Sequence, residues 1–389
     1  MNEIILPEFF SPLGDGGTEI INIRDKNHGA VTKSRAALFF YGDEGNPFLA
    51  PRGLHTVDGK LIVADTAQNR VFIWNEMPVT SYQIPDIILG QLNTTDTQRN
   101  SGGEASAATL LYPSGVWSDG NKLIVADAWN HRVLIWNNFP TANGQPADVV
   151  IGQPTMQNNL PNVKGVGSEA SAKNLYWPYG VWSDGEHLWI ADTGNRRVLF
   201  YETIPNKNYH AADKVIGKNN FEDKDYESEN AVWPYSVKVS ADGVLAITDT
   251  QYYRVLIWNN WNDAFTKTAD AIIGQPNLES CGQNQYRLKP QANTLNWCYD
   301  MFMKDGSLWL ADTGNSRILF FKKIPTQNNQ LADEQFGNIN FETIGEHLEV
   351  GKEDSERLYW PFAVSVADDK LIVADTGNHR IAFYNKYEI

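Results

Sequence analysis

One motif returns six times along this chain, at intervals of 57 to 65 residues. In its fullest form it reads LIVADTGNHRIAFYN (371–385). The aspartates that anchor the six copies are Asp65, Asp127, Asp192, Asp249, Asp312 and Asp375. Six copies at near-regular spacing indicate a repeat architecture, in which each unit buries its apolar surface against its neighbours.

Each copy contains four short apolar runs separated by turn residues. In the second copy they are PSGVWSDG (113–120), LIVAD (123–127), RVLIWN (132–137) and ADVVIGQ (147–153). The runs are rich in β-branched and aromatic residues, and Asp-Gly is a hairpin signal. Each copy therefore predicts a four-stranded antiparallel blade. Six blades predict an all-β protein, a six-bladed β-propeller.

The ends of the chain predict how the ring closes. The last copy ends in IAFYNKYEI and has no fourth run, whereas AALFFYG (36–42) resembles the missing strand. We expect 36–42 to complete the last blade, which leaves no exposed sheet edge there. The expected organisation is one propeller domain over 1–389, with an N-terminal extension over 1–35 and blades that start near residues 48, 110, 175, 231, 295 and 358.

Composition excludes several classes of protein. The formal net charge of −15 argues against nucleic acid as a partner, because that affinity rests on Lys and Arg. Two cysteines, Cys281 and Cys298, are too few for a disulfide scaffold, and either a disulfide or two free thiols is compatible with the sequence. No apolar run is long enough to span a membrane. The start of the chain does not resemble a signal peptide, so a cytoplasmic location is expected, or a secreted or periplasmic one if a leader has been removed.

The repeated pattern P-x-G-V, then L-[IW]-[VI]-A-D-T-G-N-x-R-[VI], resembles the NHL repeat family in all six copies. It is most similar to the bacterial long-period repeats, which carry IGQP and NRVLIWN strands. The resemblance implies a propeller. It does not imply one function, since NHL propellers include RNA-binding domains, protein-interaction modules and a metal-linked peptide-amidating lyase.

Asp-Thr-Gly also surrounds the catalytic carboxylates of aspartic proteases. A protease needs two such carboxylates facing one another, and a ring keeps six copies apart. We therefore expect the six aspartates to be structural turn residues that accept backbone N–H groups and an arginine two strands away. We expect the glycine to provide the left-handed conformation of the turn.

One face of the predicted ring carries both the Asp-Thr-Gly-Asn turns and the connections between blades, and we call it the top face. Long segments follow Gln91, Gln153, Lys218, Gln275 and Asn338, whereas the turns of the opposite face are expected to be short. Long loops on a rigid scaffold are where binding sites are usually built.

Aromatic residues flank the proline that begins most inner strands. Those that follow it are expected closer to the central axis and in contact with a ligand, whereas the preceding tryptophans are expected to pack between blades or to join the site. The ligand-binding residues predicted at the top-face mouth are Arg52, Tyr112, Tyr179, Trp233, Tyr235, Trp297, Tyr299, Asp300 and Phe362.

Departures from the repeat point to the same face. Arg52 replaces an aromatic residue in the first copy, and NWCYDM (296–301) places Asp300 at a position of glycine. These two residues could bind a charged ligand or pair with each other. Trp129 and the QYY segment (251–253) also alter turns of the top face.

No catalytic constellation is evident. The zinc site of an amidating lyase needs three histidines at the mouth, and only His55 lies on an inner strand. A calcium site of the lactonase type would find Asn296 and Asp300 but no glutamate. The sequence predicts no metal ligand and identifies no catalytic residue. A metal ion bound in the channel stays an open alternative. The sequence favours a module that binds protein, peptide or a small molecule; the alternative is a lyase or hydrolase acting at the same mouth, with or without a metal ion.

Overall fold

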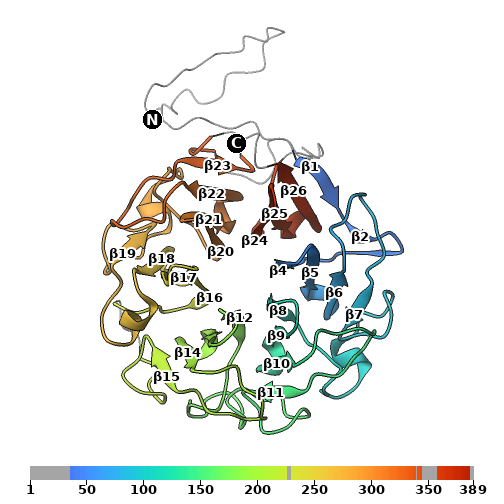
Figure 1. Cartoon of the computed structure of the whole chain (residues 1–389). Coiled ribbons are helices and arrows are strands. Elements are labelled where there is room, and N and C mark those ends of the chain that lie inside the picture. Colours follow the sequence, from blue (N-terminus) through green and yellow to red (C-terminus); the bar gives the residue numbers. More distant parts are fainter. Residues whose placement is uncertain (1–35, 226–228, 339, 344–356, 386–389) are drawn as a thin grey trace, which may run out of the picture. The chain divides into compact units, whose positions relative to one another are not determined.

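The computed structural model describes residues 36–225, 229–338, 340–343 and 357–385. The chain divides into two units, 1–30 and 31–389, and every described residue belongs to the second. This unit is all-β, and its strands form six four-stranded antiparallel blades around a ring (Figure 1). The predicted six-bladed propeller is confirmed.

Each blade runs from an inner strand at the axis to a short outer strand. Blade I contains β4 (Gly53–Val57), β5 (Lys60–Asp65), β6 (Arg70–Trp74) and β7 (Ile87–Leu89). Blade II contains β8 (Pro113–Ser118), β9 (Leu123–Asp127), β10 (Arg132–Trp136) and β11 (Val149–Ile151). Blade III contains β12 (Pro178–Ser183), β13 (Leu188–Asp192), β14 (Arg197–Tyr201) and β15 (Lys214–Ile216).

The other half of the ring repeats this plan. Blade IV contains β16 (Pro234–Val239), β17 (Leu245–Asp249), β18 (Arg254–Trp258) and β19 (Ala271–Ile273). Blade V contains β20 (Cys298–Lys304), β21 (Ser307–Asp312), β22 (Arg317–Phe321) and β23 (Glu334–Phe336). Blade VI contains β24 (Pro361–Ala367), β25 (Lys370–Asp375), β26 (Arg380–Asn385) and, from the other end of the chain, β1 (Ala36–Phe40). A small hairpin of β2 (Gly42–Asp43) and β3 (Asn46–Pro47) follows β1.

Blade VI joins the two ends of the ring, as predicted. β1 pairs antiparallel with β26, with Phe40 opposite Ile381 (Figure 1). Phe40 is fully buried, and its ring contacts those of Phe48, Trp74 and Phe383. Residues 1–35, the expected extension, lie outside the described residues.

The core consists of layers between neighbouring blades. The second and third strands of each blade are buried almost throughout, and one apolar cluster joins Ile124 and Ile135 of blade II to Val181 and Leu199 of blade III. Both faces of a blade are covered, which is why these strands read as continuous apolar runs instead of alternating ones.

A buried ion pair closes the hairpin between the second and third strands. In blade III, Asp192 accepts the Tyr176 N–H on Oδ1 at 2.7 Å, and Oδ2 accepts from Arg197 Nε and Asn195 Nδ2, both at 2.8 Å. The arginine lies directly across the turn on the adjacent strand, and not two strands away as expected. The same pair occurs in every blade at 2.7 to 3.0 Å, from Asp65, Asp127, Asp192, Asp249, Asp312 and Asp375.

The role predicted for the glycine of this turn is wrong. The left-handed residue is the one after asparagine, for example Arg196 with φ 57°. Gly194 is needed because a Cβ there would lie 2.6 Å from the Tyr176 carbonyl oxygen. Its N–H donates to that oxygen at 2.8 Å, whereas Ala67 makes the corresponding bond at 3.3 Å. Glycine therefore allows a closer approach of the two backbone segments.

Two side chains of the turn reach the next blade. Thr66 donates its hydroxyl proton to the Pro113 carbonyl at 2.7 Å, and Thr250 donates to that of Cys298 at the same distance. At the left-handed position, His131 Nδ1 accepts the Trp177 N–H at 3.1 Å, and Asn69 Oδ1 accepts that of Tyr112 at 2.9 Å. The sequence analysis missed these contacts, which tie several of the corners to the start of the blade beside them.

We expect Gly314→Ala to lower the free energy of unfolding by about 1–2 kcal/mol. Its Cβ would lie 2.7 Å from the Asn296 carbonyl oxygen, and the turn would have to widen toward the 3.3 Å that Ala67 shows. Urea denaturation measures the change. Gly103→Ala is the control, because Gly103 has an ordinary φ of −124° and the nearest atom to its added Cβ, the Asn100 carbonyl oxygen, lies 3.8 Å away. A loss at Gly314 below a few tenths of a kcal/mol would show that close approach is not the reason for this glycine.

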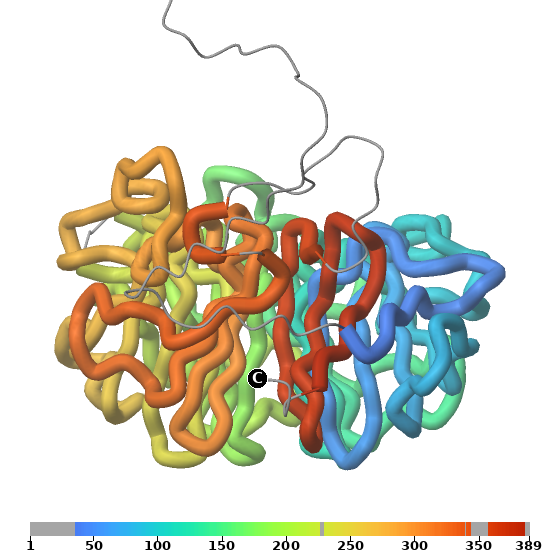
Figure 2. Tube along the Cα trace, turned by 90° about the horizontal axis from the view of Figure 1, so that it is seen from above, coloured from blue at the N-terminus to red at the C-terminus, as the bar shows by residue number. Residues whose placement is uncertain are grey.

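The two faces of the ring differ less in loop length than expected. The connections between blades lie on the top face over residues 90–112, 152–177 and 274–297, and over the described parts of 217–233 and 337–360. In the edge-on view, green and orange segments rise on the same side of the ring (Figure 2). On the opposite face the turns after the inner strands are short, but the connections to the outer strands, such as 75–86 and 137–148, are longer than predicted. Among the described residues, no helix has the length and apolar character to cross a membrane.

Candidate functional site

Six residues meet at the axis near the top face, each of them directly after the proline position of its repeat, which is Cys298 in blade V. Aromatic rings dominate this tier, which we call the plug: Arg52, Ser114, Tyr179, Tyr235, Tyr299 and Phe362. Tyr235 lies between Tyr179, whose ring stacks on it at 4.6 Å, and Tyr299, whose edge approaches at the same distance. Tyr299 in turn stacks on Phe362 at 4.2 Å. The ring contacts close the channel, and Tyr235 and Phe362 are only 6% and 5% exposed.

The plug contains neutral phenols. Burial raises the pKa of Tyr179 and Tyr299 well above the usual tyrosine range, and the nearby Tyr235 acts in the same direction on both. Their hydroxyls can therefore donate hydrogen bonds at neutral pH but cannot serve as bases.

The aromatic residues before the inner strands form a more exposed ring around the plug. We call it the rim; its members are Tyr112, Trp177, Trp233, Trp297 and Trp360, together with Trp129 from the turn that follows β9. Trp297 and Trp360 are 44% and 40% exposed, and Tyr112 stacks on Trp129 at 4.5 Å. Trp297 and Trp360 thus present surface to solvent, while the aromatic residues nearer the axis are largely packed against one another; ligand contact by either set stays a prediction.

The position directly after each plug residue is occupied by a small residue in most blades, for a geometric reason. A Cβ at Gly53 would lie 1.8 Å from the Ser114 carbonyl oxygen of the next blade, so no larger residue fits there. Blades IV and V depart from this rule with Ser236 and Asp300, and both side chains are buried.

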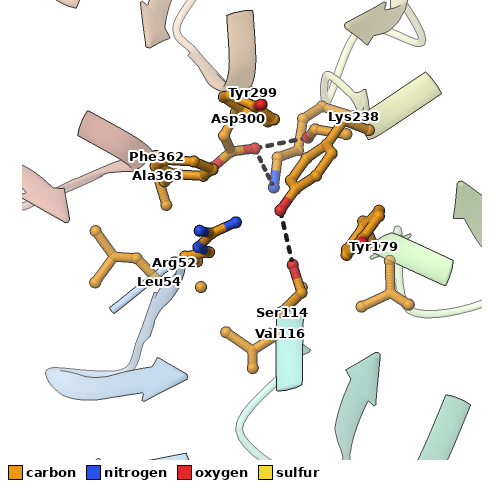
Figure 3. A pocket seen from close by; sticks show the side chains of 16 residues that line it. Arg52, Leu54, Ser114, Val116, Tyr179, Lys238, Tyr299, Asp300, Phe362 and Ala363 are labelled. Carbon is orange, nitrogen blue, oxygen red and sulfur yellow. Dashed lines mark hydrogen bonds and ion pairs between the residues drawn. The ribbon is translucent and has the colours of Figure 1, made fainter. Parts of the chain in front are cut away.

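Asp300 does not pair with Arg52. Its carboxylate accepts the Ser236 hydroxyl at 2.6 Å and lies 3.4 Å from the Lys238 ammonium, as Figure 3 shows. The Val364 N–H donates to the second oxygen at 3.4 Å. Lys238 also lies over the Trp182 ring, 4.9 Å from its centroid. The carboxylate is held inside the channel wall.

Arg52 stands apart from this network. Its guanidinium lies 4.2 Å above the Phe362 ring and 5.1 Å from that of Tyr112, and it points toward the axis (Figure 3). Burial acts to lower its pKa, but the hydroxyls of Tyr235 and Tyr112 outweigh burial and raise it. In the described part of the chain it has no carboxylate partner, and its Nε is buried without a hydrogen bond.

The sequence analysis missed a third tier, three residues further along each inner strand. Two positions keep tryptophan, whereas others break the repeat: His55, Trp117, Trp182, Lys238, Phe302 and Ser365. His55 is buried, and its Nε2 bonds the Ser118 carbonyl at 2.8 Å. The sequence had already singled out His55 on an inner strand, and comparing this position across the repeats would have revealed Lys238 as well.

Two buried histidines should make the fold sensitive to acid. Burial lowers the pKa of His131 to about 4, and burial together with the charge of Lys238 lowers that of His55 to about 4. The unfolded chain takes up these protons near pH 6.5, so stability is complete above that value and declines as pH falls toward 4, by up to about 3 kcal/mol per histidine.

We therefore expect His131→Asn to reduce the loss of melting temperature between pH 7 and pH 4.5. Asparagine, which occupies the same position at Asn69, keeps an acceptor for the N–H of the next blade but cannot be protonated. Calorimetry at the two pH values measures the difference, with the more exposed His187→Asn as the control. Equal acid slopes for the variant and the unmodified protein would contradict the assignment.

Both cysteines are free thiols. Cys298 is fully buried, donates to the Arg254 carbonyl at 3.2 Å, and has a pKa raised well above the usual thiol value by burial. Over the described ranges, no three His, Cys, Asp or Glu side chains are grouped so as to hold a metal ion.

The free space enclosed by the plug and the tier below is only about 30 Å³. A single water molecule needs about 10–15 Å³ of such space, so there is room for only two or three non-hydrogen atoms. A whole ligand would therefore lie against the rim, and only a small group could reach between the plug residues.

Comparisons with known proteins show a similarity of fold alone. No protein-family model and no curated protein matches the chain. Among solved structures, a streptogramin B lyase matches at 12% identity and TM-score 0.44, covering 89% of this chain and 96% of the other. The WD40 propeller domain of Doa1 matches at 8% and 0.47, covering 91% and 98%. A nidogen/laminin complex matches at 11% and 0.39, covering 74% and 85%. Likenesses this distant carry no argument about function.

Proposed function

We propose that this chain is a propeller of the NHL-repeat type that binds a protein, peptide or small-molecule ligand on the rim of its top face. The observation that most directly supports this proposal is that an exposed aromatic rim surrounds a channel filled by the plug. Trp297 and Trp360 offer flat apolar surface to solvent, whereas the enclosed space behind them is too small for a substrate. Such a surface suits planar rings, sugars or peptide side chains, and the acidic balance of the chain disfavours nucleic acid.

The enzyme alternative ranks second for a structural reason. The acid–base groups nearest the mouth, Asp300 and Lys238, are buried and bind each other. General acid–base catalysis needs such groups within hydrogen-bond reach of a substrate. Here the tyrosine and phenylalanine rings of the plug lie between them and the rim.

Ligand-observed NMR with indole, benzamide, a short neutral peptide and a disaccharide tests the proposal. We expect at least one probe to bind, and the double variant Trp297→Ala/Trp360→Ala to abolish the signal. The matched control is Val79→Ala/Ile84→Ala, which removes two even more exposed apolar side chains from the 75–86 connection on the opposite face. The exposed tryptophans are better targets than Tyr235 or Asp300, because changes at those buried positions would also disturb packing. Signals that survive the rim variant, or vanish equally in the control, would refute the proposal.

A further inference from the structure

We propose that Arg52 is an anion anchor, and that the ligand of the rim carries a carboxylate which enters the plug beside this guanidinium. The inference rests on the proposed binding function and specifies its ligand class. It draws on the charge at the axis, the surroundings of Arg52 and the size of the free space.

The axis is locally positive in a protein of formal net charge −15. Three charged side chains line the channel pocket, namely Arg52, Lys238 and Asp300, and Figure 3 shows both cations directed toward its centre. Asp300 balances Lys238, from which it lies 3.4 Å away. The charge of Arg52 is left without a counterion among the described residues.

The surroundings of Arg52 fit a carboxylate. The flat guanidinium is supported by the Phe362 ring and remains partly exposed, and a guanidinium binds carboxylates through two parallel hydrogen bonds. Tyr235 and Ser114, whose hydroxyl oxygens lie 3.4 Å apart, provide further donors nearby.

The free space sets the size of the group. About 30 Å³ accommodates a carboxylate head, and the remainder of the ligand would then lie on the rim. The carboxylate could belong to a free acid or to the C-terminus of a peptide, since the local chemistry is the same for both.

Paired acid and amide probes test the anchor. Benzoate is compared with benzamide, and a tripeptide that ends in tryptophan is compared with its C-terminal amide, by ligand-observed NMR and quenching of tryptophan fluorescence. We expect an acid to bind at least about tenfold more tightly than its amide, as a charge-assisted pair of hydrogen bonds would give. The pair that shows the larger preference indicates the source of the carboxylate.

Three variants test whether Arg52 causes the preference for the acid over the amide. Arg52→Gln should remove it, Arg52→Lys should keep part of it, and Arg99→Gln, which removes an exposed arginine from a top-face connection, should leave it unchanged. Melting temperatures confirm that each variant is folded. Equal binding of acid and amide, no acid-dependent signal at millimolar concentration, or a preference that survives Arg52→Gln would each overturn the anchor.

The anchor and the binding function fail in different ways. If acid and amide bind equally and both are lost in Trp297→Ala/Trp360→Ala, the rim binds ligands but Arg52 does not select them. If no probe depends on the rim tryptophans, the proposed function itself fails.

Discussion

Replacing Asp192 with asparagine should lower the free energy of unfolding by about 3–5 kcal/mol, or prevent folding altogether. The carboxylate is fully buried and binds three donors, among them Arg197, which is itself fully buried. Asparagine would leave the guanidinium charge without a counterion and would turn an amide N–H₂ toward one of the donors. Urea denaturation of the purified variant measures the loss.

The control for this change is Asp184→Asn. Asp184 is partly exposed and pairs with His187 at 2.8 Å, while its other oxygen caps the backbone of the same turn, a role that asparagine can take over. Its effect should stay below about 1 kcal/mol. Similar losses for the two variants would mean that the repeated aspartate does not owe its importance to a buried ion pair.

Phe40→Ala should cost about 3–5 kcal/mol, because it opens a cavity where the ring closes. The Phe40 side chain is fully buried, and its ring lies 5.0 Å from Trp74 of blade I and 6.5 Å from Phe383 of blade VI. The change therefore weakens β1 and its contact with both flanking blades. Thermal and urea unfolding measure it.

Leu288→Ala is the matched control for Phe40→Ala. Leu288 is 94% exposed in a top-face connection, and its removal should change stability by less than about 0.5 kcal/mol. A loss at Phe40 no larger than that at Leu288 would show that the closing strand is dispensable for stability.

The sequence predicts the blades well because the strands and turns of a blade depend on residues that are close together in the chain. Apolar runs such as LIVAD (123–127) and the turns between them recur in every copy, and the missing fourth strand of the last copy identifies AALFF (36–40) as its replacement. Because the pattern recurs in six copies, an ambiguous run in one copy is interpreted by comparison with the same run in the others.

The site is predicted less well because it depends on contacts across the axis. The inner strand β20 has a register irregularity between Cys298 and Met301, so Asp300 lies within a bulge and counting residues does not assign its face. Its partner Lys238 lies on another blade, at a position of the repeat that differs from its own. Likewise, the left-handed φ of Arg196 is set by the turn as a whole and could not be read from the neighbouring glycine.

The seam between β1 and β26 also constrains how the molecule can be made. The strand that pairs with Ala36–Phe40, Arg380–Asn385, is synthesised more than three hundred residues after it. Throughout that interval the nascent polypeptide carries an apolar strand with an unsatisfied edge, a situation in which chains aggregate or recruit chaperones. Blade VI can therefore be completed only after the last repeat has been synthesised, and the risk of aggregation lasts until then.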